Sequence, residues 1–97
     1  MIKVSADMYN GYITIAGHAG QGPKGQDIVC AAVSAIADSL QCAAERSPAP
    51  HEIQDGGDIM LIQGTGDKWL EALICAVHAL TRIQKAYPLN VEVVVHG

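Results

Sequence analysis

Apolar and polar residues alternate at the start of the chain, which is the pattern of strands with one buried face. In the first eight residues, the apolar side chains of Ile2, Val4 and Ala6 alternate with the polar side chains of Lys3, Ser5 and Asp7. Asn10-Gly11 marks a tight turn, because both residues tolerate positive φ. Residues 12–16 then alternate again. We therefore predict a β-hairpin that ends near Gly17 and His18.

Two longer segments repeat apolar residues at helical spacing. The first follows Asp27, a residue type that favours the N-cap, and should end around Arg46, before the Pro48-Ala49-Pro50 break. Its apolar stripe is Val29, Val33, Ile36, Leu40 and Ala43. The second follows a turn and cap at residues 64–67 and stops before Pro88. Its stripe is Trp69, Leu73, Ala76, Val77, Leu80 and Ile83.

The remaining apolar runs complete a sheet. Ile53 and the run 59–62 flank Gly56-Gly57, which predicts a second hairpin. Residues 91–95 form a last strand with Val91, Val93 and Val95 on one face. The resulting order ββαββαβ predicts a two-layer α/β sandwich, with a mixed sheet and two helices on one face. The other sheet face then needs a cover, and we expect a homodimer to provide it.

Composition narrows the class of protein. The chain has 97 residues, which we interpret as one domain spanning 1–97. Its net charge is −4, Lys and Arg do not cluster, and Phe is absent, so we expect no nucleic-acid surface. Neither a signal peptide nor an apolar run of membrane-spanning length is recognised, so we expect a cytoplasmic protein without a membrane partner. Three cysteines without a CxxC pair favour free thiols over disulfides or a metal site.

Cys30 carries the first candidate chemistry. With Asp27 as N-cap, Cys30 lies in the first helical turn, where the positive end of the helix dipole favours the thiolate form. The same turn leaves backbone N–H groups unpaired, and we expect these to bind the oxyanion of a tetrahedral intermediate. Cys30 also lies about 100° from the apolar stripe, at the edge of the buried face. This position is supported by the core and still reachable from outside.

His18 is the candidate base for that thiol. It precedes the glycine-rich segment 19–26, which allows the strand end to approach the helix start. An imidazole within reach of a thiol is the minimal activated nucleophile, and Ser34 lies one turn beyond Cys30 on the same flank. However, a lone cysteine near an apolar stripe is most often a small buried hydrophobe. Spacing alone also leaves open a non-enzymatic dimeric module that binds an anion, at Gly22–Gly25, or a protein.

The segment of residues 17–34 carries a resemblance. It reads GHAGQGPKGQDIVCAAVS and resembles the signature of the ribosomal-processing cysteine protease (Prp) family, in which GHA precedes a loop with spaced glycines and then GxDIVCAxxS. The residues in register are Gly17, His18, Gly22, Gly25, Asp27, Cys30 and Ser34. Pro23 is a departure from the family pattern, because a proline stiffens the backbone within a loop that is expected to move. Outside residues 17–34 we find no equally specific motif.

The resemblance implies a Cys–His protease that removes the N-terminal extension of a large-subunit ribosomal protein, the twenty-seventh in the conventional list. A similar cleavage acts on phage capsid and scaffold proteins. By this resemblance Cys30 is the nucleophile and His18 the general base, without a cofactor. Residues 20–26, with Gly20, Gly22 and Gly25, would be a mobile loop that orders over substrate. Family members form homodimers, which agrees with the one-sided sheet predicted above.

Several other residues have two interpretations. Asp27 either orients His18 as the third member of a triad or acts only as the helix cap. Cys42 and Cys75 lie within the predicted helices and are expected to be core or interface thiols. Three further histidines lack metal-ligand spacing and are expected at the surface: His51, His78 and His96. Trp69 is expected in the core.

Overall fold

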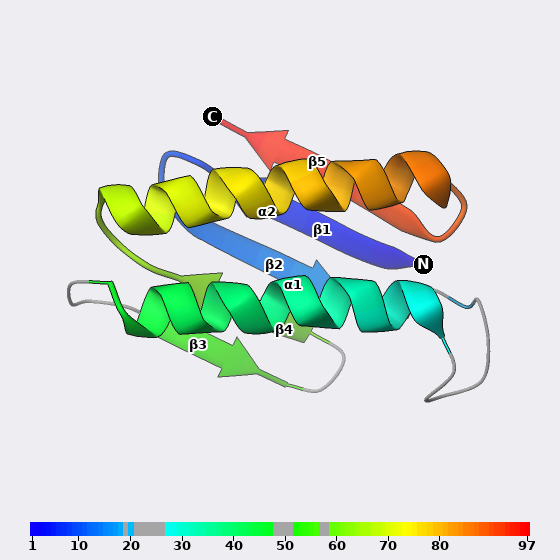
Figure 1. Cartoon of the computed structure of the whole chain (residues 1–97), viewed down its shortest axis with the longest axis horizontal. Helices are drawn as coiled ribbons and strands as arrows, with labels where there is room; N and C mark the ends of the chain where they lie inside the picture. The colour runs from blue at the N-terminus through cyan, green and yellow to red at the C-terminus, as the bar shows by residue number, and fades with distance from the viewer. Residues whose placement is uncertain (19, 21–26, 48–51, 57–58) are drawn as a thin grey trace.

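The order of elements is ββαββαβ, as predicted (Figure 1). The computed structural model describes residues 1–18, 20, 27–47, 52–56 and 59–97. The elements are β1 (Ile2–Asp7), β2 (Tyr12–Ala16), α1 (Ile28–Glu45), β3 (Glu52–Asp55), β4 (Ile59–Gln63), α2 (Asp67–Ala86) and β5 (Val91–His96). The hairpins and helices thus lie where the alternation and the helical spacing placed them.

The five strands of the described residues form one mixed sheet, in the order β3-β4-β2-β1-β5. β1 and β5 are parallel, and the other neighbouring pairs are antiparallel. Val4 lies opposite Ile15 on one side and Val93 on the other. Because side chains alternate between the faces of a strand, this register collects the buried apolar residues of the strands on a single face of the sheet.

Both helices pack side by side on that apolar face (Figure 1). α1 buries Val29, Val33, Ala37, Leu40 and Ala44. Of the predicted stripe, Ile36 and Ala43 are only half-buried and pack against the edge of the core. Ile36 instead borders the groove between the helices, beside Ala72 and Cys75 of α2. The buried surface of α1 is broader than one stripe because the helix contacts both the sheet and α2.

Trp69 anchors the start of α2 in the core, as predicted. Its side chain is 2% exposed, and its indole N–H donates a 2.7 Å hydrogen bond to the carbonyl of Gly11. Gly64 must be glycine, because a Cβ there would lie 2.5 Å from the indole ring. The cap position lies within the predicted turn and cap at residues 64–67. α2 begins at Asp67 itself, so the cap position falls on Gly66, which has no side chain to cap the helix.

α1 also corrects one expectation from composition. By length and composition it would be able to cross a membrane, contrary to our expectation that no segment reaches this length. Its apolar character comes from alanines together with the residues that pack on the sheet and α2. On the opposite side of the sheet, the register places Tyr12, Thr14, Leu61 and Val94 among polar residues. This is the face for which we predict a second copy as cover.

Candidate active site

Asp27 places the first turn of α1. Its backbone is extended, at φ −82° and ψ 106°, and its Oδ1 accepts hydrogen bonds from the N–H groups of Val29 (3.0 Å) and Cys30 (2.9 Å). The predicted N-cap is therefore confirmed. The expectation that these N–H groups are unpaired is wrong, because the cap already satisfies them. An oxyanion at this site would be stabilised by the dipole of α1 rather than by the N–H groups of Val29 and Cys30.

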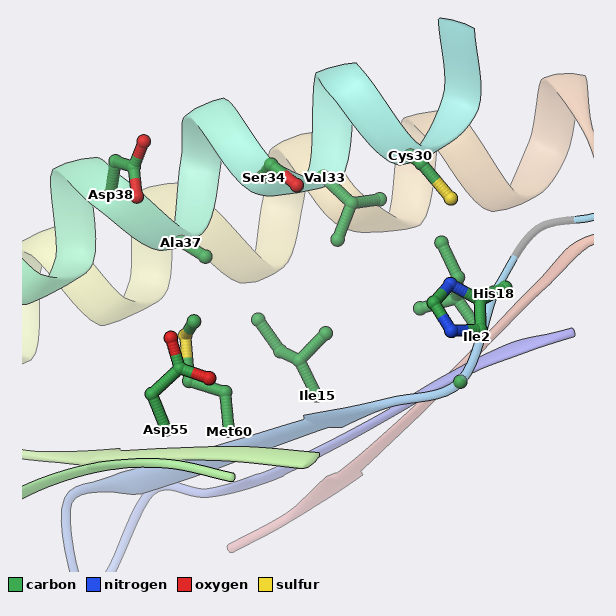
Figure 2. A pocket seen from close by; sticks show the side chains of 11 residues that line it. Ile2, Ile15, His18, Cys30, Val33, Ser34, Ala37, Asp38, Asp55 and Met60 are labelled. Carbon is green, nitrogen blue, oxygen red and sulfur yellow. The ribbon is translucent and has the colours of Figure 1, made fainter. Parts of the chain in front are cut away.

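A cleft runs from this turn along α1. It has a volume of about 340 Å³, and α1 contributes Cys30, Val33, Ser34, Ala37 and Asp38 to its wall (Figure 2). These residues follow Cys30 at offsets of three, four, seven and eight, which places them along one side of a helix. One flank of α1 therefore carries the thiol, the Ser34 hydroxyl and a carboxylate in sequence.

The floor of the cleft comes from the sheet. Ile15 of β2 lies opposite Met60 of β4, and Met60 lies opposite Asp55 of β3, so these three side chains form a row across three strands. Ile2 of β1 extends the floor on the other side of Ile15. The centre of the cleft is therefore apolar, with a carboxylate where the row reaches the edge strand.

Cys30 and His18 meet at one end of the cleft. The thiol of Cys30 points from α1 toward the sheet, and the ring of His18, just after β2, lies below it (Figure 2). Cys30 is half-buried and packs against the core, whereas His18 is exposed. The fold thus brings together a nucleophile and an imidazole that are twelve residues apart in the sequence. This is the arrangement needed for an activated thiol.

The backbone of Gly17 sets the direction in which the chain leaves β2 and enters His18. Its φ is +93°, and a Cβ at this position would lie 2.3 Å from the carbonyl oxygen of Met1. A side chain is thus excluded both by backbone conformation and by the close approach of the chain before β1. The glycine in the GHA motif therefore has a physical role, since it lets the chain turn out of the sheet directly before the imidazole.

The predicted mobile loop falls mostly outside the described residues. Gly20 is described, with φ at +77° and open space around it. Gly22 and Gly25 lie outside the described residues, as does Pro23. The loop's role over substrate therefore stays a prediction.

The remaining candidate residues lie away from the cleft. Cys42 and Cys75 are exposed in the single chain, which excludes the core, and their alternative role as interface thiols stays a prediction. His78 accepts a hydrogen bond from Nε of Arg82 at 3.2 Å, and His96 is exposed at the end of β5. His51 lies outside the described residues. Among the described residues, no group of three or more His, Cys, Asp or Glu side chains would hold a metal ion.

Asp38 and Asp55 are cleft residues that sequence reasoning missed. A signal existed for Asp38, since it follows Cys30 by eight residues on a helix and so falls on the same flank. Asp55 shares a strand face with Ile53, which the alternation also indicates. The sequence predicts the hairpin of β3 and β4 but not the pairing of β4 with β2, which brings Asp55 to the floor opposite α1.

Comparisons with known proteins extend over nearly the whole chain. The family model of cysteine protease Prp matches residues 1–92, which include both walls of the cleft. No curated protein sequence matches the chain. A crystal structure of an essential ribosomal processing protease Prp from S. aureus, with a covalently linked product peptide, superimposes with a TM-score of 0.85 at 25% identity. The match covers 98% of this chain and 99% of that one.

Two further solved structures share the fold. The S. aureus protease in complex with a substrate peptide has a TM-score of 0.77 at 23% identity, with 98% of this chain and 99% of that chain covered. A Streptococcus mutans protein has a TM-score of 0.72 at 22% identity, with coverage of 98% and 91%. At these identities the two structures support the fold, including the order of strands and the helix pair.

Proposed function

Because the chain belongs to the cysteine protease Prp family, we propose that it removes the N-terminal extension of a bacterial large-subunit ribosomal protein, with Cys30 as nucleophile and His18 as general base. The observation that carries the proposal is the position of the Cys30 thiol and the His18 ring at one end of the same cleft. The S. aureus proteases of similar fold, described as ribosomal processing enzymes, support the choice of substrate class.

The reaction follows from these two side chains. An extended substrate segment lies along the cleft with its scissile carbonyl at Cys30. His18 accepts the thiol proton, and the thiolate attacks the carbonyl carbon to form a tetrahedral oxyanion near the positive end of the α1 dipole. The C–N bond then breaks as the protonated His18 donates its proton to the leaving amine. Water, deprotonated by His18, hydrolyses the thioester and frees the new carboxylate and the Cys30 thiol.

Two neighbouring residues support this chemistry. Asp27 holds the first turn of α1 and with it the backbone of Cys30. Orientation of the His18 ring by the Asp27 carboxylate is the alternative role, and the two are separated below. Ser34 lies one turn beyond Cys30 on the cleft wall, where its hydroxyl can support the thiol or a backbone carbonyl of the substrate.

A peptide that spans the ribosomal extension tests the proposal. We expect the wild type to cleave it at one bond, identified by mass spectrometry, and Cys30→Ala to have no activity. His18→Ala should lower the rate by about 10²- to 10⁴-fold, the usual contribution of a general base. Cys42→Ala, which changes an exposed thiol outside the cleft, is the matched control and should cleave normally.

Three results would change or refute this proposal. Cleavage of a phage capsid or scaffold peptide in place of the ribosomal one would assign the chain to the second substrate class. Full activity of Cys30→Ala would refute the nucleophile. No cleavage of either peptide by the wild type would refute the proposed function.

The open face of the sheet supports a homodimer as the functional form. It carries Tyr12, Leu61 and Val94, which a second copy would shield from water. Sedimentation measurements of the wild type and of Leu61→Glu test this: the wild type should sediment as a dimer and the variant as a monomer. A monomeric wild type at micromolar concentration would refute the dimer.

A further inference from the structure

Met60 is the flexible side chain in the floor of the cleft. It lies between Ile15 and Asp55 in the row across three strands, and it is half-buried against the core. Methionine is unbranched and rotates about three side-chain bonds, so it adopts several shapes unless a neighbour holds it. The shape of this part of the cleft therefore depends on what fixes the Met60 side chain.

Gln41 of α1 supplies that contact. Its Nε2 donates a 3.4 Å hydrogen bond to Sδ of Met60, and the contact is partly buried. A thioether sulfur is a weak acceptor, so the bond orients the Met60 side chain more than it stabilises the fold. It forms a bridge between the helix that makes the wall of the cleft and the strand that makes its floor.

Helix geometry places this bridge at the far end of the cleft from Cys30. Ala37 and Asp38 are the last residues of α1 that line the cleft, and in Figure 2 they lie at the same end as Met60. Gln41 follows Ala37 by four residues, so it lies one turn further along the same flank of the helix. The described residues that line the cleft do not include Gln41. The cleft therefore stops where Gln41 reaches Met60.

The position of Gln41 relative to Cys30 gives the length that the bridge leaves open. Gln41 is eleven residues beyond Cys30 in α1, which corresponds to about 16 Å along the axis at 1.5 Å per residue. An extended peptide advances by about 3.3 Å per residue. A substrate with its scissile bond at Cys30 that follows α1 would therefore meet the bridge after about four to five residues.

We infer that Gln41 is a positioning residue that closes the substrate cleft, because it holds the Met60 side chain in place and occupies the space beyond it. The inference rests on the proposed function, in which a peptide lies along this cleft with its scissile bond at Cys30. Gln41 takes no part in bond breaking. It limits the length of substrate that the cleft holds to about four to five residues on one side of the bond.

A series of peptides of increasing length tests the inference. The series starts from the peptide that spans the ribosomal extension, shortened around its cleaved bond and then lengthened by one residue at a time on either side. For the wild type, we expect kcat/KM to rise with added residues on one side and to level off at about four to five. For Gln41→Ala, each of the next two residues on that side should raise kcat/KM about two- to threefold further, mainly through KM, because the opened cleft buries more apolar surface of the peptide.

Two variants serve as controls. Gln63→Ala removes a glutamine of β4 whose Nε2 donates a hydrogen bond to the carbonyl of Asn10, outside the cleft, and it should keep the wild-type length dependence. Gln41→Met keeps the bulk of the side chain, so it should level off near the wild-type length. The readout is the ratio of kcat/KM for the longest peptide over the five-residue one, which cancels any loss of folded enzyme. A Gln41→Ala variant that loses stability at an unchanged ratio overturns the inference.

Binding separates this inference from the proposed function. The same peptides, labelled with fluorescein, are titrated against Cys30→Ala and against Cys30→Ala combined with Gln41→Ala by fluorescence anisotropy, so length dependence is measured without cleavage. Absence of cleavage by the wild type would refute the proposed function, whereas the length dependence of binding would still decide the role of Gln41. An affinity that levels off at the same length with and without the Gln41 side chain overturns that role.

Discussion

The carboxylate of Asp27 accepts a 2.9 Å hydrogen bond from the backbone N–H of Cys30. The residue that begins α1 is therefore tied directly to the residue that carries the thiol. Asp27 is 9% exposed, so this bond is well shielded from water. One side chain thus fixes the start of the helix and the place of the candidate nucleophile at once, and substitutions at Asp27 affect both.

Asp27 variants separate a structural from a catalytic role. Asp27→Ala should lower the free energy of unfolding by about 1 to 2 kcal/mol, because it removes the cap. Asp27→Asn should stay within about 0.5 kcal/mol of wild type, since asparagine is an equally good cap. We expect near-wild-type cleavage by Asp27→Asn. A loss of more than tenfold at unchanged stability, measured by urea unfolding and peptide cleavage, would instead assign the carboxylate the orientation of His18.

Thiol labelling tests the reactivity of Cys30. Exposure alone would make Cys42 and Cys75 react first, since Cys30 is only half-buried and the other two are exposed. We expect the reverse order near neutral pH, with Cys30 about tenfold faster, because His18 lies beside its thiol and can accept the thiol proton as the sulfur attacks. Mass spectrometry of iodoacetamide-treated protein gives the three rates.

A histidine pair provides the control for labelling. His18→Ala should slow the reaction of Cys30, whereas His78→Ala, on the exposed side of α2, should leave it unchanged. Labelling of all three thiols in proportion to their exposure would argue strongly against the nucleophile.

Gly17→Ala should damage both stability and activity. The substituted residue must keep a φ of +93° or move, and its Cβ would overlap the carbonyl of Met1. We expect the free energy of unfolding to fall by about 1 to 3 kcal/mol. We also expect His18 to be displaced, so that the protein that remains folded cleaves the substrate peptide more slowly. Gly56→Ala is the control, because a Cβ there meets only an ordinary contact at 3.5 Å. Equal stability of the two variants would contradict the role given to Gly17.

Asp7 should make the first hairpin sensitive to acid. Hydrogen bonds from the backbone N–H and the side-chain amide of Asn10, and from the N–H of Tyr9, hold the pKa of Asp7 below its ordinary value of 3.8. A lowered folded pKa means that the stabilisation is complete above the ordinary value and is lost as pH falls through the folded one. The melting-temperature difference between wild type and Asp7→Asn should therefore be largest near neutral pH and shrink in acid.

Removal of the partner checks that interpretation. Asn10→Ala deletes the side-chain donor to Asp7 but keeps the backbone donor. It should reduce the acid dependence in part. A melting-temperature difference between wild type and Asp7→Asn that is the same at every pH would show that the carboxylate's charge plays no role in this turn.

The fold was largely predictable because strand alternation has a period of two. The alternation assigns Ile2 and Val4 to the same face of the sheet. A shift of the strand by one residue would move every one of its side chains to the opposite face. Helical spacing is less decisive. Ile36 and Ala37 are neighbours only about 100° apart on α1, and which of them is buried depends on how the helix lies against α2 and the sheet.

The residues at the Cys30 end of the cleft could be predicted from the sequence, whereas those at the opposite end largely could not. Cys30 and Asp27 belong to one helix start, so local capping rules place them relative to each other. His18 was recognised through the motif around it. Asp55 reaches the cleft because the predicted hairpin of β3 and β4 joins the sheet through the pairing of β4 with β2, which no local pattern encodes. For the same reason, the acidic end of the cleft emerged only with the tertiary structure.

The parallel pairing of β1 with β5 has a consequence for biosynthesis. Ile2 lines the cleft, and its register partner is Val91, so part of the floor rests on a strand that the ribosome makes last among these elements. Until residues 91–96 have left the exit tunnel, β1 is an edge strand and Ile2 lacks that neighbour. A nascent chain would then carry Cys30 and His18 in an incomplete fold. We expect cleavage activity to arise only once residues 91–96 have left the exit tunnel and β5 has paired with β1.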